Sequence, residues 1–177
     1  DKEVRGQGIG SFSAAVRTGH EQGLIGDETA AFVAANARAL DDAVARAQAN
    51  RADWRFEYFG LRTVNDRYLL RHPLTRAVIE SPQYWLMRVA AGLSHTAEEA
   101  VEFFELLSSL AYLPSSPTLF NAGTRHEQLS SCFLLDSPQD TLESIYAKYG
   151  DIAQLSKFSG GIGVGYSRVR ARGSLIR

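Results

Sequence analysis

The last third of the chain contains two short apolar stretches separated by one helical stretch. Residues 130–135 (SSCFLL) have the length and composition of a strand, and alternating apolar residues from Ile162 to Tyr166 predict a second strand. Between them Asp140 is placed to cap a helix, and apolar residues repeat at helical spacing: Leu142, Ile145, Tyr149, Ile152 and Leu155. These elements predict a βαβ unit with parallel strands, in a sheet or barrel that further residues would continue.

The part of the chain before this unit is predicted to be helical. Residues 27–48 carry an apolar stripe at helical spacing, with Asp27 placed to accept backbone N–H groups at its start. Residues 54–68 are rich in aromatic side chains and contain Gly60, which predicts a short helix and a turn whose rings pack in the core.

Two further helices are marked by their first residues. Ser81 followed by Pro82 is typical of an N-cap and first helical position, and Thr96 with Glu99 forms a capping-box pattern. Prolines and serines from Pro114 onward then interrupt the helical pattern. We therefore expect an all-α domain over residues 1–112 and the start of an α/β domain over residues 113–177.

Composition limits the classes of partner. The chain has 177 residues, 19 basic against 20 acidic side chains and a formal charge of −1, so no basic footprint favours a nucleic-acid polymer or an anionic membrane. No apolar run approaches the roughly 20 residues of a membrane span, and no secretory signal is recognisable. A single cysteine, Cys132, fits a reducing compartment, so the expected location is cytoplasmic. The first residue, Asp1, and the abrupt last residues suggest a piece of a longer polypeptide.

The glycines of residues 160–165 (GGIGVG) superficially resemble a dinucleotide-binding fingerprint. That motif follows a strand and opens a helix, whereas here the glycines follow a helix and precede a strand. A helix C-cap explains Gly160 but not Gly163 and Gly165. Glycines inside a strand often mark the close approach of a ligand, which leaves room for a substrate.

The side chains that could carry chemistry each have a structural alternative. Cys132 is on base rates a buried small hydrophobe, and the hydroxyls before it can hold a phosphate or sugar or simply cap a turn. Strand alternation would place Arg168, Arg170 and Arg172 on one face, where they could bind phosphate oxygens or form a solvated edge. The four histidines are scattered, so no metal site is expected: His20, His72, His95 and His126.

Several segments together resemble the large subunit of class I ribonucleotide reductases. The most specific are residues 114–124 (PSSPTLFNAGT), 128–135 (QLSSCFLL) and 156–177 (SKFSGGIGVGYSRVRARGSLIR). Residues 58–70 (YFGLRTVNDRYLL) and 80–92 (ESPQYWLMRVAAG) resemble the helical domain of that family. The resemblance implies an α+β fragment, in which an all-α N-terminal helical domain precedes the first βαβ elements of a ten-stranded α/β barrel.

The resemblance also implies a reaction and a substrate site. In the family a thiyl radical removes the 3′ hydrogen of a ribonucleotide, the 2′ hydroxyl leaves as water, and a cysteine pair supplies the electrons. Cys132 matches the first cysteine of this redox-active pair, and its partner has no counterpart in the chain. Ser116, Ser131 and Gly161 match residues that bind the ribonucleoside diphosphate substrate, together with Cys132.

A second implied site binds allosteric effectors, deoxynucleoside triphosphates or ATP. Asp140, Thr141 and Leu142 match the segment that contacts effector base and sugar, and Arg170 and Arg177 match its phosphate-binding arginines. The family further implies a homodimer, a radical-generating small subunit that holds the metal and radical cofactor, and thioredoxin or glutaredoxin as reductant. No cofactor is expected in this chain itself.

The radical cysteine and its acid/base neighbours are also without counterparts here, so the fragment alone is expected to be inactive, and no ATP-cone segment is recognisable. Two alternatives stay open: a cobalamin-dependent (class II) ribonucleotide reductase, and a non-catalytic nucleotide-binding or interaction module with the same fold.

Overall fold

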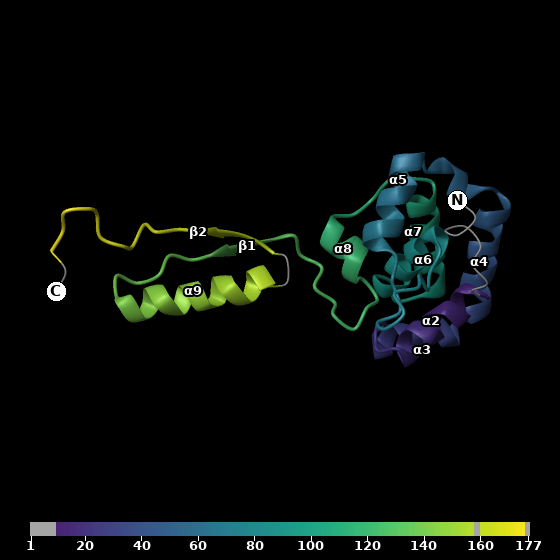
Figure 1. The fold of residues 1–177 in the computed structure, drawn as a ribbon, viewed down its shortest axis with the longest axis horizontal. Coiled ribbons are helices and arrows are strands. Elements are labelled where there is room, and N and C mark those ends of the chain that lie inside the picture. The colour runs from purple at the N-terminus through teal and green to yellow at the C-terminus, as the bar shows by residue number, and fades with distance from the viewer. Residues whose placement is uncertain (1–9, 158–159, 176–177) are drawn as a thin grey trace. The chain divides into compact units, whose positions relative to one another are not determined.

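The computed structural model describes residues 10–157 and 160–175. The chain forms two compact units, Asp1–Leu129 and Ser130–Arg177, which are considered separately. The described part of the first unit is built from helices (Figure 1): α2 (Phe12–Glu21), α3 (Asp27–Ala35), α4 (Ala37–Ala49), the 3-10 helix η1 (Ala52–Arg55), α5 (Tyr58–Thr63), the π-helix η2 (Val64–Tyr68), α6 (Pro82–Gly92), α7 (Ala97–Ser108) and α8 (Ser116–Asn121). This confirms the predicted helical N-terminal region.

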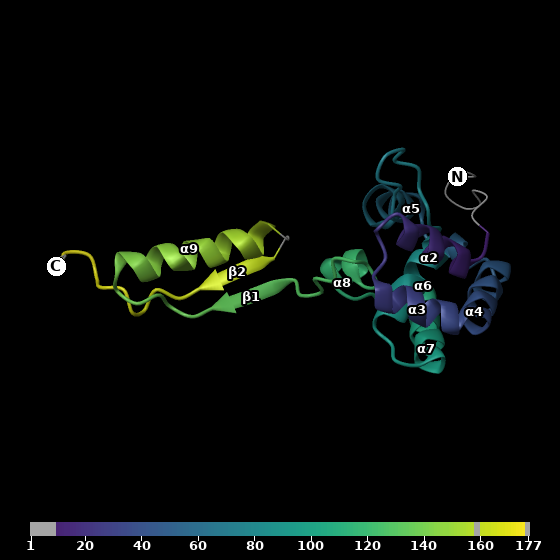
Figure 2. The same ribbon diagram turned by 90° about the horizontal axis from the view of Figure 1, so that it is seen from below.

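Helix α6 lies at the centre of the helical unit, between α2, α3, α4 and α7 (Figure 2). It begins as its sequence predicts, because Ser81 Oγ accepts a hydrogen bond from Tyr84 N and Pro82 occupies the first turn. Its apolar side chains are almost completely excluded from solvent: Trp85, Leu86, Met87, Val89 and Ala90. A helix that is apolar on nearly all sides needs neighbours on all sides, which explains its central place.

Helix α7 confirms the predicted capping box. Thr96 Oγ1 accepts a hydrogen bond from Glu99 N (3.2 Å), and the Glu99 carboxylate accepts one from Thr96 N (3.3 Å). The pKa of the Glu99 carboxyl is lowered, chiefly because the His95 backbone N–H donates a hydrogen bond to it. Behind this cap, Phe104 and Leu107 are buried against the rest of the unit.

The prediction of a single helix over residues 27–48, with Asp27 at its N-cap, is wrong in both parts. The helix is interrupted at Asn36, whose Nδ2 donates to Phe32 O (2.9 Å) and so competes with the helical backbone for that carbonyl. Asp27 is not the N-cap, because Gly26 occupies that position. The Asp27 carboxylate instead accepts hydrogen bonds from Arg125 (3.2 Å) and pairs with His20 Nε2 (2.8 Å).

The aromatic stretch of residues 54–68 was expected to pack in the core, and for three of its rings this is wrong. Trp54, Tyr58 and Phe59 are 67%, 68% and 80% exposed. Gly60 lies within α5 and does not interrupt it. Tyr68 does pack as expected, since its ring stacks on Phe120 with centroids 4.4 Å apart.

Residues 113–129 pack on the helical unit, so this compact unit extends past residue 112, where we expected the domain boundary, to Leu129. Trp85 Nε1 donates to Leu119 O (2.9 Å), which ties α8 to α6. Gly92 contacts the backbone of Gly123 so closely that a Cβ atom at position 92 would lie 2.3 Å from the Gly123 nitrogen. These two contacts with α6 attach the segment to the helical unit.

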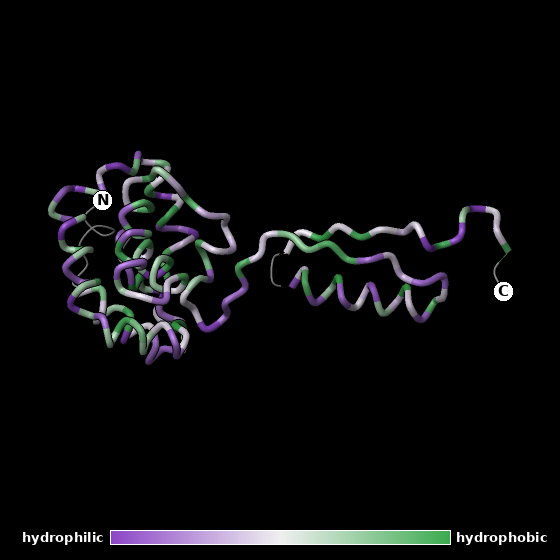
Figure 3. The backbone as a smooth tube through the Cα atoms, turned by 180° about the vertical axis from the view of Figure 1, so that it is seen from behind, coloured by the Kyte–Doolittle hydropathy of each residue, from purple (hydrophilic) through white to green (hydrophobic). Residues whose placement is uncertain are grey.

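The second unit is the predicted βαβ unit. Strand β1 (Cys132–Leu135) pairs in parallel with β2 (Gly161–Val164), and α9 (Leu142–Lys157) connects them and packs against β2 (Figure 1). Hydrophobic colour is concentrated on the strands and alternates with hydrophilic colour along α9 (Figure 3). Half-buried positions alternate with exposed ones in both strands, so Cys132 and Gly161 share the more exposed face.

Candidate functional site

The parallel pairing of the two strands brings together three of the four predicted substrate residues. Cys132 is the residue opposite Gly161 in the register, and Gly161 N donates to Ser131 O (2.8 Å). A Cβ atom at position 161 would lie 3.3 Å from Cys132 Sγ and 3.4 Å from Ser131 O. Glycine therefore keeps the space beside the thiol free of a side chain.

Cys132 is exposed, contrary to the base-rate expectation that a lone cysteine is a buried hydrophobe. A thiol must be accessible to react with a disulfide partner or a substrate, and this one lies at the first residue of β1. Within the described residues the site is thus an accessible sulfur bordered by a glycine and by backbone atoms of Ser131.

Ser116, the fourth predicted substrate residue, belongs to the helical unit. It is the first residue of α8, is exposed, and its Oγ lies 3.0 Å from Tyr68 OH. Its membership of the same site as Cys132 stays a prediction.

The predicted effector residues that the structure describes lie at the opposite end of the strands from Cys132. Asp140 and Thr141 are in the loop before α9, Leu142 opens α9, and Arg170 is in the segment after β2. Arg170 Nε donates to Asp140 Oδ2 (2.6 Å), and Arg170 Nη2 donates to Asp140 O (3.2 Å). Thr141 Oγ1 accepts a hydrogen bond from Ser144 N (3.2 Å), so Thr141 has the capping role expected of Asp140. Leu142, 72% exposed, is the first residue of α9. Arg177 lies outside the described residues.

The expectation that three arginines share one face of a strand is wrong, because β2 ends at Val164 and turns follow it. Arg168 faces the loop after β1, where its Nη2 lies 2.8 Å from Asp136 Oδ2 and its backbone N donates to Ser137 Oγ (3.1 Å). Sequence reasoning did not identify Asp136 and Ser137. Their signal was turn chemistry, an Asp-Ser-Pro sequence directly after an apolar strand.

Tyr166 strengthens the connection between α9 and the segment after β2. A hydrogen bond with Tyr149 is the largest cause that raises the pKa of the Tyr166 phenol, followed by burial. The Tyr166 hydroxyl therefore stays protonated at neutral pH and remains available as a donor.

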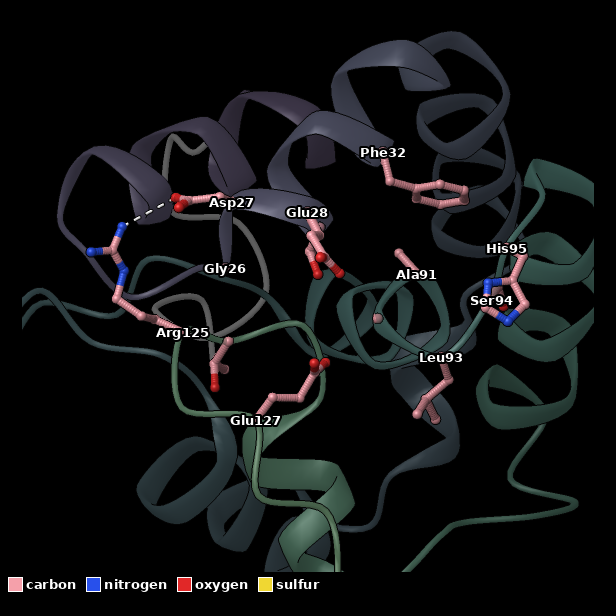
Figure 4. Close-up of a pocket in the computed structure, with 13 residues that line it drawn as sticks. Gly26, Asp27, Glu28, Phe32, Ala91, Leu93, Ser94, His95, Arg125 and Glu127 are labelled. Carbon is pink, nitrogen blue, oxygen red and sulfur yellow. Dashed lines mark hydrogen bonds and ion pairs between the residues drawn. The ribbon is translucent and has the colours of Figure 1, made fainter.

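An open pocket of about 760 Å³ in the helical unit is a weaker candidate for a nucleotide site. Figure 4 shows the carboxylates of Glu28 and Glu127 pointing into it, with Arg125 paired to Asp27 at its edge. Acidic side chains disfavour phosphate groups, and none of the predicted site residues lines this pocket. In the described part of the chain we find no cluster of side chains suited to a metal ion, and no helix there is long and apolar enough to cross a membrane.

Comparison with known proteins gives the same division of the chain. The family described as "Ribonucleotide reductase, all-alpha domain" matches residues 55–127, and "Ribonucleotide reductase, barrel domain" matches residues 130–177. Among similar proteins, the ribonucleoside-diphosphate reductase subunit alpha of Chlamydia trachomatis is 44% identical over 140 residues, 77% of this chain and 13% of the relative. The large subunit of Arabidopsis thaliana is 39% identical over 162 residues, 91% of this chain and 19% of the relative.

The large subunit of Vaccinia virus is 44% identical over 125 residues, which are 70% of this chain and 16% of the relative. The chain thus spans less than a fifth of the length of these relatives. The two parallel strands lie within the residues that match the barrel domain, so the fold is consistent with the start of that barrel. The chain belongs to the family of ribonucleotide reductase large subunits, which confirms the resemblance seen in the sequence.

Proposed function

We propose that this chain forms the N-terminal part of the large subunit of a cytoplasmic ribonucleoside-diphosphate reductase. The complete subunit would reduce ribonucleoside diphosphates to deoxyribonucleotides for DNA replication. The observation that carries the proposal is the exposed thiol of Cys132, opposite Gly161 in a parallel pair of strands. Two family descriptions and the names of the relatives support it, and none of the relatives compared is named as a cobalamin-dependent enzyme.

The proposed role of Cys132 is to donate electrons. Its thiol and a second thiol, supplied outside these residues, lose two hydrogens in total and form a disulfide, while the ribose 2′ hydroxyl leaves as water. Holding both sulfurs in contact makes the closure intramolecular and therefore fast. Ser131 and Gly161 would border the ribose beside the thiol, and Ser116 would contact the substrate from the helical domain.

The partners follow from this chemistry. A radical-generating small subunit, which holds the metal and radical cofactor, would start the reaction, and thioredoxin or glutaredoxin would reduce the disulfide after each turnover. We expect the full-length subunit, with its small subunit and a dithiol, to convert cytidine diphosphate to its deoxy form. Turnover with a cobalamin cofactor and no small subunit would instead identify the cobalamin-dependent alternative.

We also propose that the loop before α9 binds an allosteric deoxynucleoside triphosphate or ATP in a homodimer. Asp140, Thr141 and Leu142 would contact its base and sugar, and Arg170 and Arg177 its phosphates. Support comes from the proximity of Arg170 to Asp140, since the residues proposed for sugar and phosphate lie within hydrogen-bonding distance. The Arg170 guanidinium also donates to Leu175 O (2.7 Å), which orients its planar group.

Replacing Arg170 with alanine tests the effector site. A hydrogen bond to a charged group contributes about 1.5–3 kcal/mol, so Arg170→Ala should weaken effector binding by about tenfold to a hundredfold. Arg177→Ala should act in the same direction. Arg172→Ala is the matched control, because it removes the same charge from an exposed position of the same segment. Equilibrium binding of deoxythymidine triphosphate to the full-length subunit measures the effect, and unchanged affinity in both Arg170 and Arg177 variants would refute the assignment.

A further inference from the structure

Arg168 holds the loop between β1 and α9 through its backbone and its side chain. Its backbone N donates to Ser137 Oγ (3.1 Å), and its Nη1 donates to Ser137 O (3.3 Å). Its Nη2 forms an ion pair with Asp136 Oδ2 (2.8 Å). One residue after β2 is therefore bonded to two consecutive residues after β1.

The receiving side of this contact is ordered by its own hydrogen bonds. Ser137 is only 6% exposed, and its Oγ donates to Pro138 O (3.2 Å) while accepting from Arg168 N. Ser137 N donates to Asp136 Oδ1 (2.8 Å), which leaves Oδ2 of the same carboxylate for Arg168. A buried hydroxyl that both donates and accepts fixes its neighbours more strictly than an exposed one, because losing either bond leaves a buried polar group unpaired.

These contacts lie next to the proposed effector residues, both in the loop after β1 and in the segment after β2. Ser137 and Asp140 belong to one loop, and Arg168 and Arg170 belong to one short segment. Arg170 reaches Asp140 itself, whereas the side-chain contacts of Arg168 are to Asp136 and Ser137. Arg170 thus bonds a proposed effector residue, whereas Arg168 joins the two segments that carry the proposed effector residues.

We propose that Arg168 is a positioning residue of the effector site, which sets the separation between Asp140 and Arg170 by clamping Asp136 and Ser137. This inference rests on the effector site proposed above. A guanidinium that holds an ion pair and a carbonyl at once cannot be replaced fully by an ammonium, because lysine lacks the planar fork. Affinity for a deoxynucleoside triphosphate should therefore depend on Arg168 although it does not bind the nucleotide.

The experiment compares Arg168→Ala, Arg168→Lys and Asp136→Asn with the control Arg172→Ala in the full-length subunit. We expect Arg168→Ala to weaken deoxythymidine triphosphate binding on the order of tenfold, since small misplacements of binding groups have effects of this size or larger. Asp136→Asn should have a smaller effect in the same direction, and Arg168→Lys should recover part of the loss. At saturating effector, the stimulated rate of Arg168→Ala should return to that of the parent.

Three outcomes would overturn the inference, and they separate it from the proposed function. Parental affinity in Arg168→Ala, with weak binding in Arg170→Ala, would remove the positioning role and leave the effector site standing. A reduced stimulated rate at saturating effector, with parental affinity, would show only a general structural role. Parental affinity in both Arg168→Ala and Arg170→Ala would refute the effector site, and the positioning role with it.

Discussion

Cys132→Ser in the full-length subunit is expected to lower multiple turnover with thioredoxin by about a hundredfold or more. A serine hydroxyl is close in size to the thiol but cannot form a disulfide, so it supplies no electrons to the substrate. The replacement changes a single atom at the first residue of β1 and adds no bulk, so the pairing of the strand should be preserved. Substrate affinity should therefore change little while turnover is lost.

The measurement is deoxynucleotide formation by chromatography, with thioredoxin or a small dithiol as reductant and with the dissociation constant of the substrate determined in parallel. If Cys132→Ser formed product with added dithiol as fast as the parent, Cys132 would not belong to the reducing pair. Loss of substrate binding together with turnover would likewise point to a damaged site and not to a missing electron donor.

The largest effect on stability is expected for Arg88→Ala in the helical unit. The Arg88 side chain is fully buried, and its Nε and Nη2 each donate to the Glu80 carboxylate at 3.1 Å. Its Nη1 donates to Ala122 O (2.6 Å), so Arg88 also joins α6 to the segment after α8. Removing one partner of a buried ion pair leaves the other charge without compensation, which costs about 3–5 kcal/mol.

Urea unfolding followed by far-ultraviolet circular dichroism measures this loss. Arg62→Ala is the matched control, because Arg62 forms an exposed pair with Asp66 at 3.5 Å and should change stability by less than about 1 kcal/mol. The double variant Arg88→Met with Glu80→Leu should be more stable than Arg88→Ala, since it leaves no unpaired buried charge. An Arg88→Ala protein as stable as the Arg62→Ala protein would show that the buried pair does not hold the unit together.

The features predicted correctly from the sequence depend on neighbours a few residues away. The cap at Ser81 and the capping box of Thr96 and Glu99 need only one helical turn to form, and both appear in the structure. The βαβ unit was predicted because strand and helix periods are local, and its parallel pairing follows from the length of the connection. Local patterns therefore sufficed for the helical region and for the start of the sheet.

The errors concern contacts that periodicity does not encode. Asp27 is an ordinary N-cap candidate, but its carboxylate pairs with Arg125, nearly a hundred residues later in the chain. The spacing of Arg168 suggested a place in a strand, but β2 ends at Val164, and Arg168 instead forms an ion pair with Asp136 in the loop after β1. Phe59 looks like a core residue by type, but which face of α5 is covered depends on the tertiary packing.

The candidate site divides in the same way. The resemblance pointed to Cys132 and Gly161 separately, and the strand register places them opposite each other. Neither Asp136 nor Ser137 was identified, because a turn sequence after a strand has many structural uses and only the contact with Arg168 distinguishes this one.

The most direct test of the account is the state of Cys132 after a single turnover without external reductant. In the full-length subunit, with its small subunit and substrate, peptide mapping should find Cys132 in a disulfide with a second cysteine of the same polypeptide, in amounts equal to the deoxynucleotide formed. Deoxynucleotide formation that leaves Cys132 as a free thiol would contradict the account.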